Sequence, residues 1–121
     1  TVRAISDGKY PVTRPNHGGS TRGDCGTSVR LDTTDGHTLI LTSQRTGNTT
    51  REQMYHIGIW PEEFRIVVAK GVVSPRPAYQ PIAAEIILVN TPGVTTADLS
   101  FFTYKRRRKP LFPFEHNATY S

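Results

Sequence analysis

The chain has 121 residues, a net charge of +5, 36% hydrophobic residues and 21% charged residues. A chain of this size and composition supports one globular domain that buries about two thirds of its unfolded surface. No apolar run approaches the roughly 20 residues of a membrane span, so we expect no membrane segment. The single cysteine, Cys25, excludes an internal disulfide and favours a reducing, cytoplasmic compartment. Because the sequence begins Thr-Val-Arg without a methionine, we expect a fragment of a longer protein.

Two β-hairpins are predicted near the amino terminus, each with an Asp-Gly pair at its turn. This pair is typical of a two-residue type I′ turn, in which both central residues have positive φ angles. The strands of the first hairpin are residues 2–6 and 9–13, and those of the second are residues 27–34 and 37–43. Residues 16–26 lie between the hairpins, contain four glycines and are expected to form a loop. The loop lacks the Gly-Lys-Ser/Thr ending of a phosphate-binding P-loop.

A short helix is predicted over residues 49–57, ending near Gly58. Two threonines at its start and a glutamate or glutamine three positions later have the spacing of a capping box. Met54 and Ile57 are three residues apart, so they would lie on one face of the helix.

Two further strands are predicted over residues 64–69 and 85–90. Both segments are rich in β-branched apolar residues, which is typical of strands covered on both faces. Residues 96–99 indicate one helical turn. The pattern as a whole predicts an α+β fold, with a mixed β-sheet, hairpins and two or three short helices, in a single domain over residues 1–121.

The segment between these two strands contains candidate anion-binding residues. Gly71 allows a sharp turn, and the Ser-Pro-Arg-Pro sequence that follows predicts a short helix with Ser74 as N-cap and Pro75 at the first position. Arg76 would lie in the first turn, where the helix dipole disfavours a cation unless an acidic partner or an anionic ligand offsets it. The candidate anion-binding residues are therefore Lys70, Ser74 and Arg76. The alternative is that both cations pair with carboxylates of this or a neighbouring domain.

Five consecutive basic residues, 105–109, precede an apolar, proline-containing segment, 110–114. Aromatic residues do not alternate with the basic ones, as a stacking platform for nucleic acid would require. We therefore expect a solvated or ion-paired basic face and do not expect nucleic-acid binding. The apolar segment resembles a terminal strand that packs on the body of the domain.

No catalytic or metal-binding motif is found in the sequence. The histidines occur in separate segments without ligand spacing, and no histidine is close to Cys25 in the sequence. We expect His56 to be a half-buried packing residue and His37 to be exposed. The sequence thus predicts no catalytic residue and no metal site made by this chain alone.

Three segments, in order, resemble the carboxy-terminal domain of the microcystinase C (MlrC) family of metallopeptidases. Residues 67–83 read VVAKGVVSPRPAYQPIA, residues 89–99 read VNTPGVTTADL, and residues 104–113 read YKRRRKPLFP. Lys70 and Arg76 match the lysine and arginine of a Lys-x-x-x-x-x-Arg segment in that family. The resemblance extends in the same order over nearly the whole chain.

The resemblance implies a two-domain hydrolase in which a larger amino-terminal domain holds the catalytic zinc. No cofactor is then expected in this chain, which would be inactive alone. Its partners would be that catalytic domain, a peptide or amide substrate and a homo-oligomer. In such an enzyme this domain would close the active-site cleft, and Lys70, Ser74 and Arg76 would bind a substrate carboxylate. The alternative is a structural module for interdomain packing or oligomerisation, without a direct catalytic role.

Overall fold

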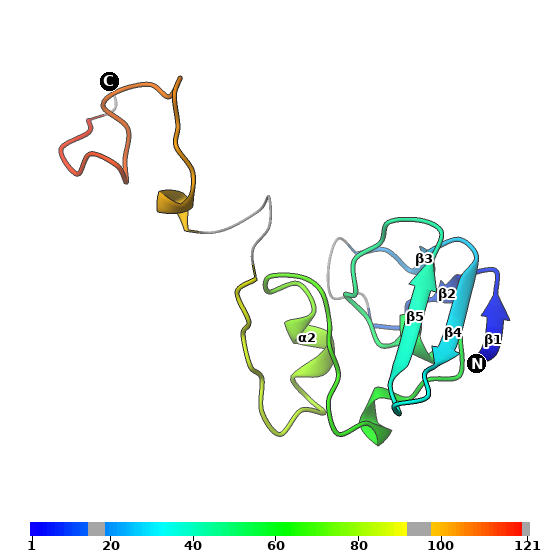
Figure 1. Ribbon diagram of the computed structural model, residues 1–121. Coiled ribbons are helices and arrows are strands. Elements are labelled where there is room, and N and C mark those ends of the chain that lie inside the picture. Colours follow the sequence, from blue (N-terminus) through cyan, green and yellow to red (C-terminus); the bar gives the residue numbers. More distant parts are fainter. Residues whose placement is uncertain (15–18, 92–97, 120–121) are drawn as a thin grey trace. The chain divides into compact units, whose positions relative to one another are not determined.

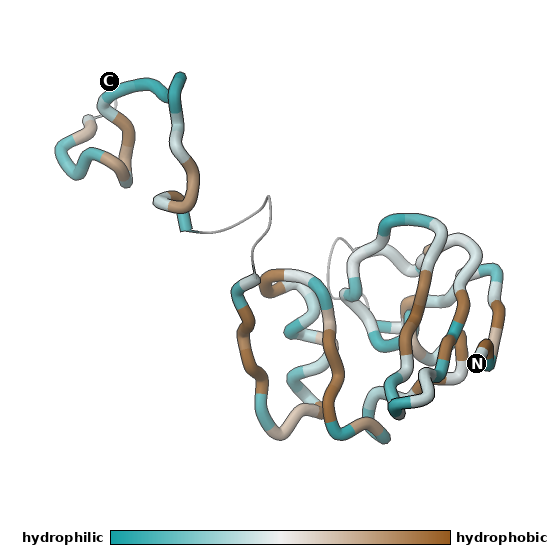
Figure 2. The backbone as a smooth tube through the Cα atoms, viewed as in Figure 1, coloured by the Kyte–Doolittle hydropathy of each residue, from teal (hydrophilic) through white to brown (hydrophobic). Residues whose placement is uncertain are grey.

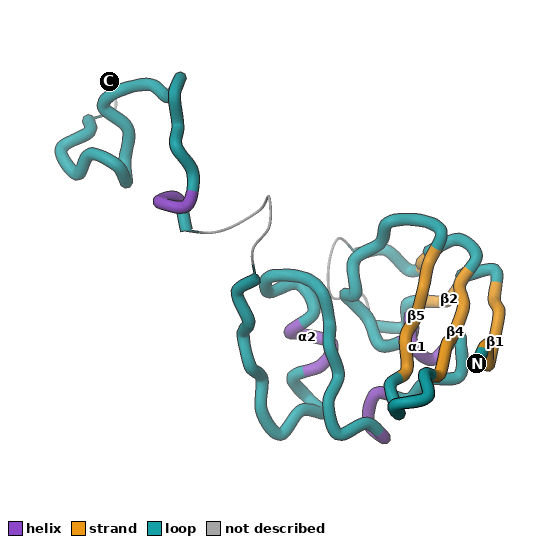
Figure 3. Tube along the Cα trace, viewed as in Figure 1, coloured by secondary structure: helices purple, strands orange, loops and turns teal. Residues whose placement is uncertain are grey.

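The computed structural model describes residues 1–14, 19–91 and 98–119 (Figure 1). The chain divides into two compact units, Thr1–Ile87 (unit 1) and Leu88–Ser121 (unit 2). Strands β1 to β5 and helices α1 and α2 belong to unit 1 (Figure 3). The predicted α+β class is confirmed, and the described strands pair antiparallel in two sheets. That residues 1–121 form a single domain stays a prediction.

The larger sheet has three strands in the order β1 (Val2–Ser6), β4 (Ser28–Asp32) and β5 (Thr38–Thr42). Strands β4 and β5 form the second predicted hairpin, with Leu31 opposite Leu39. Its turn contains Gly36 at φ 88°. The prediction of this hairpin is confirmed.

The first predicted hairpin is wrong, although both of its strands exist. Strand β1 pairs with β4, whereas β2 (Lys9–Pro11) pairs with β3 (Arg22–Asp24) in a separate two-stranded sheet. A type I′ turn needs positive φ at both central residues, and among the described residues neither Asp7 nor Asp35 has it, so the Asp35–Gly36 hairpin forms without this turn type. Instead, the Asp7 side chain accepts a hydrogen bond from the Lys9 N–H at 3.1 Å. The Asp-Gly pair therefore connects two sheets instead of closing one hairpin.

The connection between the two sheets depends on a very close approach of two glycines. Gly8 has φ 74°, and its carbonyl accepts a hydrogen bond from the Cys25 N–H at 3.0 Å. A Cβ atom at Gly8 would lie 1.8 Å from the Gly26 carbonyl oxygen. Pairing with β3 also corrects the prediction that residues 16–26 are only a loop; residues 16–18 lie outside the described part.

Helix α1 (Glu52–Tyr55) confirms the predicted short helix, but its start differs from the expected capping box. Arg51 is the N-cap, and no side chain caps the helix. The Thr50 hydroxyl donates to the Glu52 carboxylate instead of accepting a backbone N–H. The helix ends as predicted at Gly58, which has φ 72° and donates its N–H to the Tyr55 carbonyl at 3.0 Å.

The core of unit 1 is small and is formed mainly by α1, α2 (Arg76–Tyr79) and the chain just after α1. Its buried members are Met54, Ile57, Ile59, Ala78 and Tyr79. Met54 and Ile57 therefore share a buried face, as their spacing predicts. Partly buried residues from the sheet and from the chain around α2 complete this core: Ala4, Ile40, Val67, Ala69 and Ile82.

Residues 64–69 and 85–90 do not form the two predicted buried strands. No backbone hydrogen bond connects residues 65–72 or 84–91 to any other described residue. Figure 1 shows residues 64–72 as an extended chain beside α2, after the 3-10 helix η1 (Pro61–Glu63). A strand requires a hydrogen-bonded neighbour, and apolar β-branched composition alone does not provide one.

Unit 2 is organised around one arginine of the basic run. The Arg107 guanidinium donates two hydrogen bonds to the Glu115 carboxylate, at 2.5 and 2.7 Å, and lies 4.4 Å from the centre of the Phe114 ring. The Leu111 N–H donates to the same carboxylate at 2.8 Å. Residues 110–114 therefore turn around Arg107 instead of forming the predicted terminal strand. The other four residues of the run are exposed, which agrees with an ion-paired or solvated basic face.

Unit 2 also contains the 3-10 helix η2 (Leu99–Phe101). Asp98 is its N-cap, and the Asp98 side chain accepts a hydrogen bond from the Ser100 N–H at 3.0 Å. Of the helical turn predicted over residues 96–99, residues 96 and 97 lie outside the described part. No helix in the described residues is long and apolar enough to cross a membrane.

We expect unit 2 to become less stable in acid, because protonation of Glu115 removes the ion pair with Arg107. Hydrogen bonds from Arg107 and from the Leu111 N–H lower the pKa of Glu115 to about 2, compared with about 4.3 for a free glutamate. Because the folded pKa is the lower one, this stabilisation is complete above about pH 4.3 and is lost as the pH falls toward 2. An NMR titration of the Glu115 carboxyl should show a midpoint near 2. Glu115→Gln should remove this acid transition, and a midpoint near 4.3 in the native chain would contradict the assignment.

Candidate functional site

The three candidate anion-binding residues lie at and around the turn between the extended chain and α2: Lys70 ends the extended chain, Ser74 lies in the turn, and Arg76 begins α2. Lys70 and Arg76 are exposed, and neither side chain makes a hydrogen bond or ion pair with a described residue. Ser74 is half-buried. The two cations are thus not paired with carboxylates of the described chain, and pairing with carboxylates of a neighbouring domain stays the alternative to a ligand. That they bind an anion stays a prediction.

The turn itself is built by Gly71. It has φ 148°, and a Cβ atom there would lie 2.8 Å from the Ser74 hydroxyl. The chain thus folds back so tightly that Ser74 contacts residue 71, and only glycine fits this position. Gly71 has the role that the sequence predicts.

Ser74 does not cap α2, so this part of the prediction is wrong. Pro75 is the N-cap residue, already in a helical conformation, and no side chain caps the helix. The Arg76 N–H donates to the Val73 carbonyl at 3.0 Å. A helix of four residues with its first amide already bonded has neither the dipole nor the free N–H groups to bind an anion.

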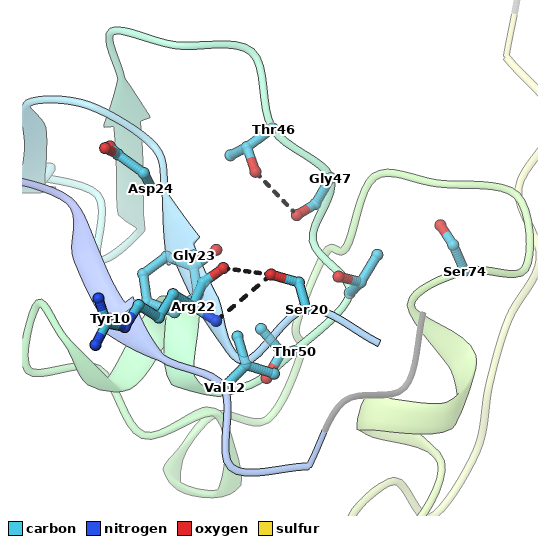
Figure 4. A pocket seen from close by; sticks show the side chains of 11 residues that line it. Tyr10, Val12, Ser20, Arg22, Gly23, Asp24, Thr46, Gly47, Thr50 and Ser74 are labelled. Atoms are coloured by element: carbon cyan, nitrogen blue, oxygen red, sulfur yellow. Dashed lines mark hydrogen bonds between the residues drawn. The ribbon is translucent and has the colours of Figure 1, made fainter. Parts of the chain in front are cut away.

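A shallow cavity of about 500 Å³ opens between the β2–β3 sheet, the chain before α1 and Ser74 (Figure 4). Its lining is mostly polar and comprises Tyr10, Val12, Ser20, Arg22, Gly23, Asp24, Thr46, Gly47, Thr49, Thr50 and Ser74. Ser74 is the one predicted site residue in this lining. The others come from segments distant in the sequence, and no sequence pattern marks them as a group.

Several polar groups of this cavity are already used by the chain itself. The Ser20 hydroxyl donates to the Arg22 carbonyl at 2.6 Å, and the Thr46 hydroxyl bonds to the Gly47 carbonyl at 3.5 Å (Figure 4). Arg22 and Asp24 place opposite charges in the same lining. The lining residues that the structure describes therefore offer no concentration of free donors or of one charge that would select a ligand.

The fold brings Cys25 and His56 together, which sequence separation does not suggest. The Cys25 sulfur lies 4.0 Å from His56 Nε2 and 3.1 Å from the Ser28 hydroxyl. Cys25 is completely buried, so no substrate can reach its thiol. His56 is half-buried and stacks 5.2 Å from the Tyr10 ring, as expected for a packing residue, and His37 is exposed as predicted.

Nothing in residues 1–14, 19–91 and 98–119 fits a metal ion. No group of three or more histidine, cysteine, aspartate or glutamate side chains is arranged to bind one there. The donors needed for a zinc centre would have to come from elsewhere.

An exposed apolar surface lies on the extended chain before Gly71, residues 65–70, which we name the unpaired segment. Its side chains alternate: Val67 and Ala69 pack on the core, whereas Ile66 and Val68 are 77% and 87% exposed. Figure 2 shows this hydrophobic stretch along the extended trace beside α2. Val72 and Val73 continue the exposed apolar surface toward α2. Two neighbouring, nearly fully exposed aliphatic side chains beside unbonded backbone are typical of an interaction surface.

The family model described as MlrC C-terminus matches residues 1–106. No curated protein and no solved structure matches the chain. Of the described elements, the matched range covers strands β1 to β5 and helices α1 and α2, together with the unpaired segment and the turn near Lys70, Ser74 and Arg76. The chain therefore belongs to the MlrC C-terminus family.

Proposed function

We propose that this chain is the carboxy-terminal domain of a cytoplasmic metal-dependent amide hydrolase. It packs on an amino-terminal domain that holds the zinc, and it closes one wall of the active-site cleft. The observation that carries the proposal is the unpaired segment, a hydrophobic surface with free backbone groups in a chain of the MlrC C-terminus family. Exposed apolar side chains and unbonded backbone groups are stabilised when another protein surface covers them. A second domain of the same protein would provide that cover at all times. No chemical step is assigned to the chain's own residues.

We also propose that this domain helps to bind the substrate through its exposed cations. Lys70 and Arg76 are exposed cations without a carboxylate partner among the described residues, and they flank the turn next to the unpaired segment. A domain that docks through this segment would bring both cations to the border of the interface. There Arg76 would bind a substrate carboxylate through two parallel hydrogen bonds, and Lys70, at the end of the unpaired segment, would add positive charge at the border.

Arg76→Ala in the full-length enzyme tests this part. We expect kcat/KM for a small peptide with a free carboxylate to fall by about 10-fold to 100-fold, the usual range for a lost charged hydrogen bond. Hydrolysis of the same peptide with an amidated carboxyl end should change little. Arg45→Ala, which also removes an exposed arginine of unit 1, is the matched control. An unchanged kcat/KM, with zinc content and stability also unchanged, would show that Arg76 does not bind the substrate carboxylate.

A purely structural module is the second candidate, because the exposed apolar side chains of the unpaired segment support packing whether or not the cations bind substrate. In that case Arg76→Ala leaves kcat/KM unchanged, while Val68→Asp separates the domains. Limited proteolysis of the full-length protein would detect the separation as faster cleavage between the domains.

A further inference from the structure

We propose that the unpaired segment is an incomplete β-sheet edge, completed by a carboxylate-bearing strand of the amino-terminal domain. The inference rests on the proposed function and adds how the two domains would join: through main-chain pairing and not through side-chain packing alone. It also states the chemistry of the partner strand.

The backbone of the segment supports pairing. The segment follows Phe64, whose φ of −100° and ψ of 136° are β-strand angles, and after a bend at Arg65 it runs as an extended trace (Figure 1). No amide or carbonyl of residues 65–70 has a hydrogen-bond partner among the described residues. A chain with β geometry, β-branched composition and free N–H and C=O groups is a template for strand addition.

The side chains give the segment two different faces. Val67 and Ala69 contact the core and hold the segment against α2. Ile66, Val68 and Lys70 alternate with them and point away from the core. The period of two is that of a strand, so an added strand would place its own alternate side chains beside Ile66 and Val68.

The charges select the partner. Arg65 and Lys70 stand at the two ends of the segment, and the described residues offer neither of them an ion pair. A partner strand with a carboxylate near each end would pair with both cations.

Amide hydrogen exchange on the full-length protein, resolved by residue with NMR, tests the inference. In the 121-residue chain alone, the amides of residues 65–70 should exchange nearly as fast as in an unfolded peptide. In the full-length protein, alternate amides of this segment should slow by about 100-fold, equal to about 2.7 kcal/mol, because only every second N–H points toward an added strand. Residues 45–47, which lie in a loop, are the internal control and should stay fast in both proteins.

Charge reversal tests the chemistry of the partner. Arg65→Glu with Lys70→Glu should reduce the protection of residues 65–70 by at least tenfold, whereas Arg65→Lys with Lys70→Arg should preserve it. Uniformly fast amides in the full-length protein would overturn strand completion. If Val68→Asp still separated the domains in that case, docking by side-chain packing, and with it the proposed function, would stand. Protection that survives charge reversal would overturn the acidic partner.

Discussion

Gly8→Ala is expected to lower the free energy of unfolding of the 121-residue chain by about 2 to 5 kcal/mol. Two costs add at this position. A left-handed backbone costs a residue with a Cβ about 1 to 2 kcal/mol, and overpacking of a rigid contact adds about 1 to 3 kcal/mol. The second cost arises because the new Cβ would lie 1.8 Å from the Gly26 carbonyl oxygen, which is backbone and cannot rotate away. For a domain of ordinary stability this is a large part of the total.

Gly36→Ala separates the two costs. Gly36 has φ 88°, but a Cβ there would meet no atom within 4 Å. We expect this variant to lose only about 1 to 2 kcal/mol. Urea unfolding followed by circular dichroism measures both variants. Equal losses would show that the contact between Gly8 and Gly26 carries no strain, which would contradict the close approach that joins the two sheets.

Ile57→Ala is expected to lower the free energy of unfolding by about 2 to 5 kcal/mol. Ile57 is 3% exposed and packs in a core of only five buried residues, so few neighbours can move to fill the space that alanine leaves. The fluorescence of Trp60, the single tryptophan of the chain, follows the unfolding transition close to this site.

Ile66→Ala is the matched control, because it removes the same atoms from a side chain that is 77% exposed. In the 121-residue chain it should change the free energy of unfolding by no more than about 0.5 kcal/mol. A loss comparable to that of Ile57→Ala would mean that Ile66 is buried in the chain alone, and the unpaired segment would then have no face left for a partner.

The sequence predicts local elements well where a single segment contains all the information. The β4–β5 hairpin, the end of α1 at Gly58 and the turn at Gly71 all depend on glycine within a few residues of the pattern that requires it. The start of α1 was less predictable, because Thr50 bonds to a side chain instead of the backbone. Capping boxes indicate where helices begin but do not fix the hydrogen bond.

Pairing between distant segments could not be predicted in the same way. The Asp-Gly pair at residue 8 looks like that of a hairpin, yet the contact with Gly26 directs the chain to β3, 13 or more residues further on. The apolar run at 64–69 has the composition of a buried strand, and only the structure shows that its hydrogen-bonding neighbour is not among the described residues. Lys70, which follows that run, and Arg76, at the start of α2, are exposed, and their role in binding an anion stays a prediction.

The exposure of the unpaired segment has a consequence for the handling of the isolated chain. Four consecutive apolar residues with free backbone groups, Ile66 to Ala69, form the kind of stretch from which intermolecular β-aggregates start. Arg65 and Lys70 border this stretch, and Pro75 follows soon after; charges and prolines at such borders act as gatekeepers that oppose stacking. The same two cations that would recognise a partner strand thus keep the chain soluble before it meets one, so neutralising them should cost solubility even where it leaves the fold intact.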